Sequence, residues 1–436
     1  MRSEVMQIQG WGGYQKIEAT VNTPQSQSAC QKEVINQTLI ARGMGRSYGD
    51  SAIAEKVLQT TYLDHLIAFD NEKGLIKVQS GVTIRELLKF IVPKGWFIAV
   101  TPGTSFVTVG GAIASDVHGK NHHINGTFCQ HVKFMTVLLG TGEMVTTSAL
   151  ELPDLFHATC GGMGLTGVIL TATLILMPIK SAHIKCIAIR TRCIDETFEQ
   201  FEVNKISNYS VAWIDCLARG KQLGRSVLML GEHIDSGSLV LEEEDPITIP
   251  IYTPATVLNK LTMKLFNESY YATARKNKIR VVSLTQYFHP LDRVGGWNKL
   301  YGKNGFVQFQ SVVPRDGGVD IMRKLLIKIS ESGTGSFLAV LKKLGEQNDN
   351  FLSFPIDGYT LALDFKMSND VVKLLSELEE MVVGVGGRIY LAKDSLMSER
   401  SFKTSYPNWR KFETVREKYG ATGKFASSQS KRLGLL

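Results

Sequence analysis

The chain contains few cysteines, lacks a long uninterrupted apolar run and shows no metal-ligand spacing. Its 436 residues include six cysteines, scattered between positions 30 and 216 without a CxxC pair. Neither a disulfide framework nor a zinc ribbon is therefore expected, and we interpret the cysteines as reduced thiols. No segment approaches the roughly 18 consecutive apolar residues of a spanning helix. Because the first ten residues, MRSEVMQIQG, lack the order of a signal peptide, we expect a cytoplasmic protein, with peripheral contact at the inner face of the membrane left open.

Acidic residues are outnumbered: 41 Asp and Glu stand against 49 Lys and Arg, which gives a net charge of +8. Such a charge suits nucleic acid, an anionic membrane surface or a phosphorylated ligand. The basic residues are spread along the chain without a dense run, so we expect no nucleic-acid partner. The length exceeds the roughly 250–300 residues at which one core stops growing, which predicts two domains.

The pattern of strand-like and helix-like segments changes near residue 181. In the first part, β-branched runs between glycines predict strands at 38–41, 75–78, 132–139 and 168–177, and apolar spacing predicts a helix at 84–91. From residue 181, strand-like segments at 184–189, 211–216, 226–230, 305–313 and 359–365 alternate with helical ones at 319–330 and 370–383. This alternation predicts an antiparallel sheet covered by helices, and hence the α+β class. We expect a cofactor domain at 1–180 and 388–436, and a substrate domain at 181–387 with a mobile insertion near 233–280.

Three glycine-rich loops carry the chemistry of the first domain: ARGMGRSYGD (41–50), TPGTSFVTVGGAIASDVHG (101–119) and CGGMGLTG (160–167). Glycine lets backbone N–H groups approach an anion, and successive amides bind phosphate oxygens. The first loop lacks the GxGxxG-then-helix order of a nicotinamide-binding fold. A plain turn between strands would explain any one loop. Three such loops together indicate one extended ligand, and a dinucleotide fits better than a small metabolite.

The motifs RGMGRSYGD, TPGTSFVTVGGAIASDVHGKNHH and GGMGLTG resemble the FAD-binding domain of the vanillyl-alcohol oxidase (PCMH-type) superfamily. Within it they resemble the family of decaprenylphosphoryl-β-D-ribose 2-oxidases. The similarity extends through LTQYFHPLD (284–292) and SFPI (353–356) to the C-terminal residues 432–434. The resemblance implies FAD as cofactor. Some superfamily members attach the flavin through a histidine in the first loop; Arg46 stands there, which implies non-covalent FAD. The implied cofactor residues are Arg42, Gly43, Met44, Gly45, Arg46, Ser47, Gly103, Thr108, Val109, Gly110, Gly111, Ser115, Asp116, His118, Val168 and Tyr390.

His118, His122 and His123 lie within six residues, but no carboxylate or cysteine stands at an established ligand spacing, so we predict no metal. An exposed basic loop is the ordinary alternative. Gln308 and Gln310 alternate on a predicted strand and face one side, where they would hydrogen-bond sugar hydroxyls or form a solvated polar face. Lys342, beside Lys343, is by itself typical of a solvated helix end. The resemblance assigns substrate contact to Lys120, Trp213, Gln308, Gln310 and Lys342.

The resemblance also places Lys393 at the flavin edge. A lysine serves as a base only if desolvation or nearby positive charge lowers its pKa. We predict Lys393, Tyr48 and His118, in that order, as the groups that take or hydrogen-bond the hydroxyl proton. The chain departs from the family at Ala362, where a cysteine is common, and at Thr360, where an asparagine occurs. These departures concern the substrate rather than the flavin.

The resemblance implies an FAD-dependent oxidoreductase that removes a hydride from C2 of a polyprenyl-phosphoryl pentose. A partner ketoreductase would then complete the sugar epimerisation, a step of cell-wall biosynthesis. Two alternatives stay open: oxidation of a soluble polyol or aldonolactone, and a non-catalytic FAD- or anion-binding protein. The segment 257–280 carries apolar residues on one face with basic residues nearby: Leu258, Leu261, Leu265, Lys260, Lys264, Arg275 and Lys276. Contact with anionic lipid and packing against the core explain it equally well.

Overall fold

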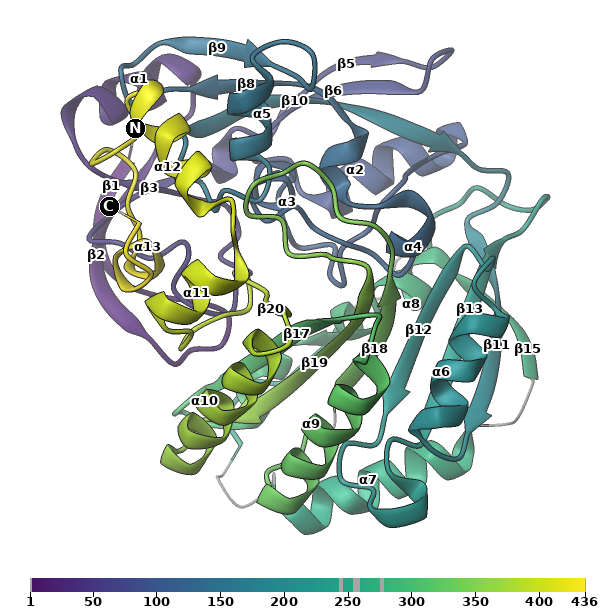
Figure 1. Ribbon diagram of the computed structural model, residues 1–436. Helices are drawn as coiled ribbons and strands as arrows, with labels where there is room; N and C mark the ends of the chain where they lie inside the picture. The colour runs from purple at the N-terminus through teal and green to yellow at the C-terminus, as the bar shows by residue number, and fades with distance from the viewer. Residues whose placement is uncertain (1, 243–245, 254–258, 275–277, 337, 436) are drawn as a thin grey trace.

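Two domains meet face to face in the structure, a computed structural model that describes residues 2–242, 246–253, 259–274, 278–336 and 338–435. Figure 1 shows the N-terminal part of the chain above and the second domain, with its long strands and helices, below. The C-terminal segment, in yellow, leaves the second domain and runs back beside the first. Both halves of the predicted division therefore contribute walls to the space between them.

The first domain contains two sheets. One has the strand order β1-β2-β4-β3, formed by Arg2–Gln9, Lys16–Thr23, Lys56–Gln59 and Ile40–Arg42. The other has the order β5-β6-β10-β8-β9, formed by Leu66–Asp70, Leu75–Gln79, Val168–Pro178, Val132–Leu138 and Met144–Thr147, and β7 (Trp96–Ile98) also pairs with β10. Helix α2 (Ile84–Ile91) begins in a capping box between Thr83 and Glu86, which satisfies its first N–H groups. The predicted strands and this helix are confirmed, with the strand predicted at 38–41 displaced to Ile40–Arg42.

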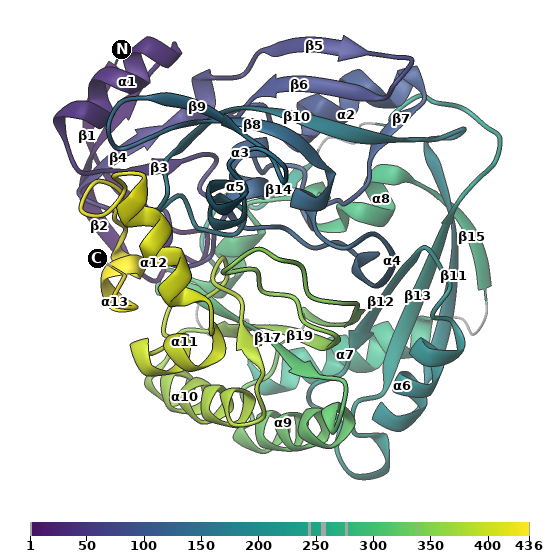
Figure 2. The same ribbon diagram turned by 45° about the horizontal axis from the view of Figure 1, so that its top comes forward.

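The second domain is built on one antiparallel sheet in the order β15-β11-β13-β12-β18-β19-β17-β20. Its strands are Lys278–Ser283, His183–Thr191, Ser226–His233, Tyr209–Ile214, Ala339–Leu344, Gly358–Lys366, Phe306–Pro314 and Arg388–Ile389. Helices α6 (Ile194–Val203), α9 (Gly318–Ser332) and α10 (Asn369–Val383) cover one face of this sheet, as Figures 1 and 2 show. The predicted antiparallel sheet covered by helices is confirmed.

Successive side chains on each strand point to opposite faces of the large sheet, and the two faces pack against different surroundings. On β17, Val307 and Phe309 are buried with the helices in the main apolar core, whereas Gln308 and Gln310 line the space between the domains. On β12, Ala212 and Ile214 belong to the core and Trp213 faces the other way. The face turned away from the helices is therefore available for a site.

The C-terminal return is fastened by two arginines. Arg416 of α12 (Trp409–Lys418) donates hydrogen bonds to the carbonyl oxygens of Leu165 and Phe425, both at 3.1 Å. Arg432 of α13 (Ser428–Arg432) contacts the carboxylates of Asp50 and Asp394, each at 2.8 Å. Because β20 still belongs to the large sheet, the return begins only after residue 389 rather than at 388.

The segment predicted as an insertion contains ordered elements. Strand β14 (Ile247–Thr248) pairs with β16 (Val294–Gly295), and helix α7 (Lys260–Thr273) lies against the large sheet. The α7 side chain Asn267 donates to Asp215 at 2.8 Å. The predicted mobility of the segment stays a prediction, and Leu258, Arg275 and Lys276 lie outside the described residues. Within the described part of the chain, no helix combines the length and the apolar character that crossing a membrane requires.

Candidate active site

A cavity of about 1110 Å³ lies between the two domains, and residues of all three glycine-rich loops line it. Sites for a single small ligand usually enclose about 300–1,000 Å³. The opposite wall is the face of the large sheet that is turned away from α6, α9 and α10. The cavity therefore has room for an extended cofactor on the loops and a second ligand on the sheet.

The first two loops pack so closely that only glycine fits at their contact. A Cβ atom on Gly43 would lie 2.3 Å from Oγ1 of Thr108, and one on Gly110 would lie 2.9 Å from Cβ of Ser80. Thr108 in turn accepts a hydrogen bond from the N–H of Gly111 (3.1 Å) at the start of α3 (Val109–Ala114). Backbone rather than side chain is thus presented to the cavity, which suits a pyrophosphate or a flat ring.

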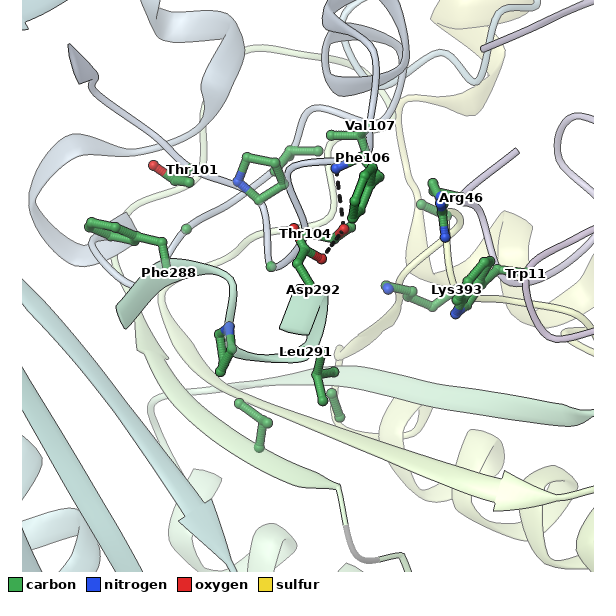
Figure 3. A pocket seen from close by; sticks show the side chains of 18 of the residues that line it. Trp11, Arg46, Thr101, Thr104, Phe106, Val107, Phe288, Leu291, Asp292 and Lys393 are labelled. Atoms are coloured by element: carbon green, nitrogen blue, oxygen red, sulfur yellow. Dashed lines mark hydrogen bonds between the residues drawn. The ribbon is translucent and has the colours of Figure 1, made fainter. Parts of the chain in front are cut away.

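Arg46 occupies the cavity wall where some superfamily members carry the flavin-linking histidine. Its guanidinium lies 4.1 Å from the Trp11 ring centroid and 5.2 Å from that of Phe106. Figure 3 shows Arg46 against Trp11, with Lys393 reaching into the same space. Burial lowers the pKa of Arg46, and the Asp292 carboxylate opposes this effect. The buried Nε has no hydrogen-bond partner among the described residues, so this donor is left for a bound cofactor.

Asp292 joins the second loop to the substrate domain, a role that the sequence analysis missed. Its carboxylate accepts hydrogen bonds from Thr104 Oγ1 (2.6 Å) and from both the backbone N–H and the hydroxyl of Ser105 (2.7 Å each). Figure 3 shows the contact between Thr104 and Asp292 at the edge of the pocket. The loop that is expected to cover the cofactor is therefore held by a residue of the other domain.

Most of the predicted cofactor residues line the cavity, but three do not. Val109 and Val168 are buried in apolar clusters instead. Asp116, at φ 38°, accepts hydrogen bonds from Asn350 (2.8 Å) and Ser353 (2.6 Å), so its carboxylate fastens the second loop to the substrate domain. The residues that do line the cavity are Arg42, Gly43, Met44, Gly45, Arg46, Ser47, Gly103, Thr108, Gly110, Gly111, Ser115, His118 and Tyr390.

Lys393 and Tyr48 form the centre of the site. The Nζ atom of Lys393 lies 3.6 Å from the Tyr48 ring centroid. Burial lowers the pKa of Lys393 to about 7; the Asp364 carboxylate acts against this and the Lys342 ammonium adds to it. Burial raises the pKa of Tyr48 well above its ordinary value. Near neutral pH, Lys393 is therefore able to act as a base while the Tyr48 phenol keeps its proton.

The carboxyl group of Asp364 is buried near Lys393 and Tyr48. Gln308 Nε2 donates to Asp364 Oδ1 at 2.5 Å, and the Tyr301 hydroxyl donates to Oδ2 at 3.3 Å. Burial raises the pKa of Asp364 to about 7. Neither Asp364 nor Tyr301 was predicted from the sequence as part of the site. Thr360, Ala362 and Asp364 nevertheless alternate on one strand, and a single carboxylate in an otherwise apolar strand needs a hydrogen-bond partner when it is buried.

His118 is held as a neutral ring. It packs beside both Phe354 and Tyr390, with centroids 5.2 and 5.1 Å away, and burial lowers its pKa well below the ordinary value. Gln310 Nε2 lies 2.9 Å from His118 Nε2 and 3.3 Å from Oγ1 of Thr360. Because the amide nitrogen only donates, His118 Nε2 accepts and its proton resides on Nδ1, which has no partner in the described part of the chain.

Lys120 and Lys342 add positive charge to the same wall. Lys120 donates to the carbonyl oxygen of Tyr287, and burial followed by the Lys342 charge lowers its pKa to about 7. Burial lowers the pKa of Lys342 to about 8. The interpretation of Lys342 as a solvated helix end is wrong, because it lies on strand β18 and faces the cavity, whereas Lys343 faces the helices and binds Glu202 at 2.7 Å. Trp213 lines the cavity as predicted.

The two histidines that follow His118 are engaged elsewhere. His122 Nδ1 accepts from the Gly345 N–H at 3.0 Å, and His123 Nε2 lies 3.0 Å from the Ser207 carbonyl oxygen. Among the residues described, no group of three or more His, Cys, Asp or Glu side chains is arranged to hold a metal ion.

Comparisons with known proteins agree with this arrangement. A sequence profile described as "FAD binding domain" matches residues 23–148, and one described as "D-arabinono-1,4-lactone oxidase" matches residues 306–433. The chain is 36% identical to decaprenylphosphoryl-β-D-ribose oxidase of Mycolicibacterium smegmatis, over 98% of this chain and 97% of that protein. It is 20% identical to L-gulono-1,4-lactone dehydrogenase of Mycobacterium tuberculosis, over 90% of this chain and 89% of that protein. The chain therefore belongs to the family of decaprenylphosphoryl-β-D-ribose oxidase, FAD-dependent oxidoreductases of the vanillyl-alcohol oxidase type.

Proposed function

We propose that the protein oxidises the C2 hydroxyl of a polyprenyl-phosphoryl pentose to the 2-keto sugar. The observation that carries this proposal is the position of Lys393, a buried amine with a pKa near 7, between the glycine-rich loops and the glutamines of β17. The near full-length similarity to a decaprenylphosphoryl-β-D-ribose oxidase supports the substrate class. FAD, when bound, supplies the acceptor for the hydride that leaves the alcohol carbon.

The residues of the chain account for the remaining parts of the reaction. Neutral Lys393 takes the hydroxyl proton as the C–H bond breaks, so that the carbonyl forms without a free alkoxide. We assign the neighbouring sugar hydroxyls to the amide of Gln310 and the ring of His118, because both residues line the cavity. Tyr48, beneath Lys393, limits the approach of water from that side. The chain thus orients one hydroxyl and provides one base for it.

Substrate choice is tested by anaerobic reduction of the purified flavoprotein. A farnesyl-phosphoryl ribose should bleach the flavin absorbance, whereas a free pentitol and an aldonolactone should not. Bleaching by the soluble compounds alone would favour the alternative function, which the profile match over residues 306–433 supports. A flavin that dithionite reduces but no alcohol reduces would point to a non-catalytic protein. Lys393→Met should slow the bleaching about 10²–10⁴-fold, and Lys343→Met, on the opposite face of the sheet, is the matched control.

We further propose that a separate ketoreductase consumes the 2-keto product and completes an epimerisation. A keto sugar that leaves this cavity requires a hydride donor for the second half of the reaction, and a reductase of the nicotinamide type has that chemistry. Incubation of both enzymes with substrate deuterated at C2 should give an epimer that has lost this deuterium. Retention of the label in the epimer would contradict a two-enzyme sequence.

Peripheral membrane contact through α7 is proposed as well. Leu261 and Leu265 are 66% and 61% exposed on its outer face, next to the exposed Lys260 and Lys264. An apolar face flanked by lysines binds anionic lipid surfaces. Sedimentation with anionic vesicles should exceed that with zwitterionic vesicles and should fall when Leu261 and Leu265 are both changed to serine. Equal sedimentation of this variant and the unaltered protein would exclude α7 as the contact.

A further inference from the structure

We propose that the cavity continues across the large sheet as an apolar groove that holds the isoprenoid tail of the substrate. The inference rests on the proposed function and extends it, since it assigns a place to the lipid rather than to the sugar. The groove begins where the polar centre ends, beside Lys342, and passes under α7 towards strand β15. Its lining residues on the sheet are Val340, Trp213, Val227, Val211, Met229 and Ala188.

The strand registers make this row continuous. Trp213 lies opposite Val340 on β18 and opposite Val227 on β13. Met229 lies opposite Val211 on one side and opposite Ala188 of β11 on the other. From β18, where the groove begins, to β15 there are four strand intervals, and at about 4.8 Å each they span about 19 Å. This length exceeds what a pentose requires several-fold.

Helix α7 forms the other wall of the groove. Phe266 and Tyr270 line the cavity, and their rings stack with centroids 6.0 Å apart. The Tyr270 ring lies 4.6 Å from that of Trp213, so the helix and the sheet touch through aromatic side chains. The helix is fixed in this position by the hydrogen bond from Asn267 to Asp215. Apolar surface on both sides of the central strands fits a branched hydrocarbon chain, and polar lining returns near β15, with Lys278 and Arg280.

The two lysines at the start of the groove indicate where the phosphate group of the substrate lies. Lys120 and Lys342 lie close enough for each to disfavour the other's charge, and both are held at the wall where the polar centre meets the apolar row. A phosphodiester between sugar and lipid would lie here and would neutralise both ammonium groups. Sugar, phosphate and tail then follow each other in the same order as the hydroxyl-binding, basic and apolar parts of the cavity.

Binding to the FAD-loaded enzyme tests the groove without any turnover. Farnesyl phosphate should bind at least tenfold more tightly than isopentenyl phosphate, as followed by tryptophan fluorescence, because the longer chain buries more apolar surface. Ala188→Phe should remove most of this difference by filling the groove. The control is Val281→Phe, which adds the same ring to the neighbouring strand β15 at an outward-facing position that is 61% exposed. Equal affinity for the two phosphates, or an unchanged difference in Ala188→Phe, would overturn the inference.

Turnover separates this inference from the proposed function. In the unaltered enzyme, KM for prenyl-phosphoryl riboses should fall at least tenfold from one to three isoprene units while kcat stays constant. In Ala188→Phe the KM advantage of the three-unit substrate should disappear, whereas Val281→Phe should keep it, and the bound-flavin absorbance of both variants shows that they are folded. Oxidation of all chain lengths with one KM would overturn the groove and leave the function standing. Tight binding of farnesyl phosphate without oxidation of any pentose would support the groove and refute the function.

Discussion

Changing Lys342 to methionine should raise the pH at which the enzyme becomes active. The Lys342 ammonium lowers the pKa of Lys393, and burial, the larger effect, remains in the variant. Without the neighbouring cation, Lys393 holds its proton more tightly, so its pKa rises above about 7. Because the reaction needs neutral Lys393, the acidic limb of the kcat/KM profile should move to higher pH.

The size of the shift follows from the position of the two lysines on one cavity wall. For two like charges about 8–12 Å apart at an effective dielectric constant of about 20, the repulsion is about 1.4–2 kcal/mol, or about 1–1.5 pKa units. At pH 7 the neutral fraction of Lys393 would fall from about one half to less than one tenth. The part of the loss that comes from protonation of Lys393 should disappear near pH 9, where Lys393 is largely neutral in both proteins.

The assay is the anaerobic rate of flavin reduction under kcat/KM conditions, which reports the ionisations of the free enzyme. Lys342→Met also removes a predicted phosphate contact, but this lowers the rate at every pH and leaves the midpoint alone. Lys343→Met is the control, because Lys343 binds Glu202 among the helices. A midpoint that stays in place or moves to lower pH in Lys342→Met would refute Lys393 as the titrating base.

Three further outcomes are expected. Acid precipitation of the purified protein should release the flavin absorbance into the supernatant, and coloured precipitate would contradict non-covalent binding. Gly43→Ala should cost about 1–3 kcal/mol and reduce the FAD content, since its Cβ would lie 2.3 Å from Thr108 Oγ1, whereas Gly318→Ala on α9, whose Cβ would meet its nearest atom at 3.4 Å, should bind FAD normally. Asp215→Ala should lower the free energy of unfolding in urea by about 3–5 kcal/mol, because it leaves Arg225 buried without this carboxylate, which lies 2.7 Å away; a loss below 1 kcal/mol would show that Glu268 replaces it.

The spacing of apolar residues was sufficient to predict many helices and strands of the fold but not how the strands pair. In α10 the buried residues Val371, Leu374, Leu375 and Leu378 follow helical spacing, and the helix predicted at 370–383 forms there. The position of β18 between β12 and β19 depends instead on pairing between segments that lie more than a hundred residues apart, such as Ala212 with Leu341. Local sequence carries no information about such a partner.

The site shows the same limit at the level of single side chains. Gln308 and Gln310 were correctly placed on one face, because a two-residue period is visible in the sequence. Lys342 was assigned to the substrate only through the resemblance, since its strand is short and the neighbouring Lys343 hides the alternation. Asp116 was assigned to the cofactor from its place in a motif, but a motif gives position along the chain and not the direction of a side chain. Asp364 needed the fold to bring Tyr301 beside it.

The alternation of Lys342 and Lys343 has an evolutionary consequence. Successive residues in the strands of the large sheet are under separate selection. One residue faces the cavity and is selected for its chemistry, and the next packs against the helices and is selected for stability. Replacements such as alanine at 362 and threonine at 360 are therefore accepted without loss of the scaffold, because Leu361 and Leu363 keep the helices in place. Substitutions at the cavity-facing positions of this sheet can therefore change substrate preference, while the helix-facing positions preserve thermal stability.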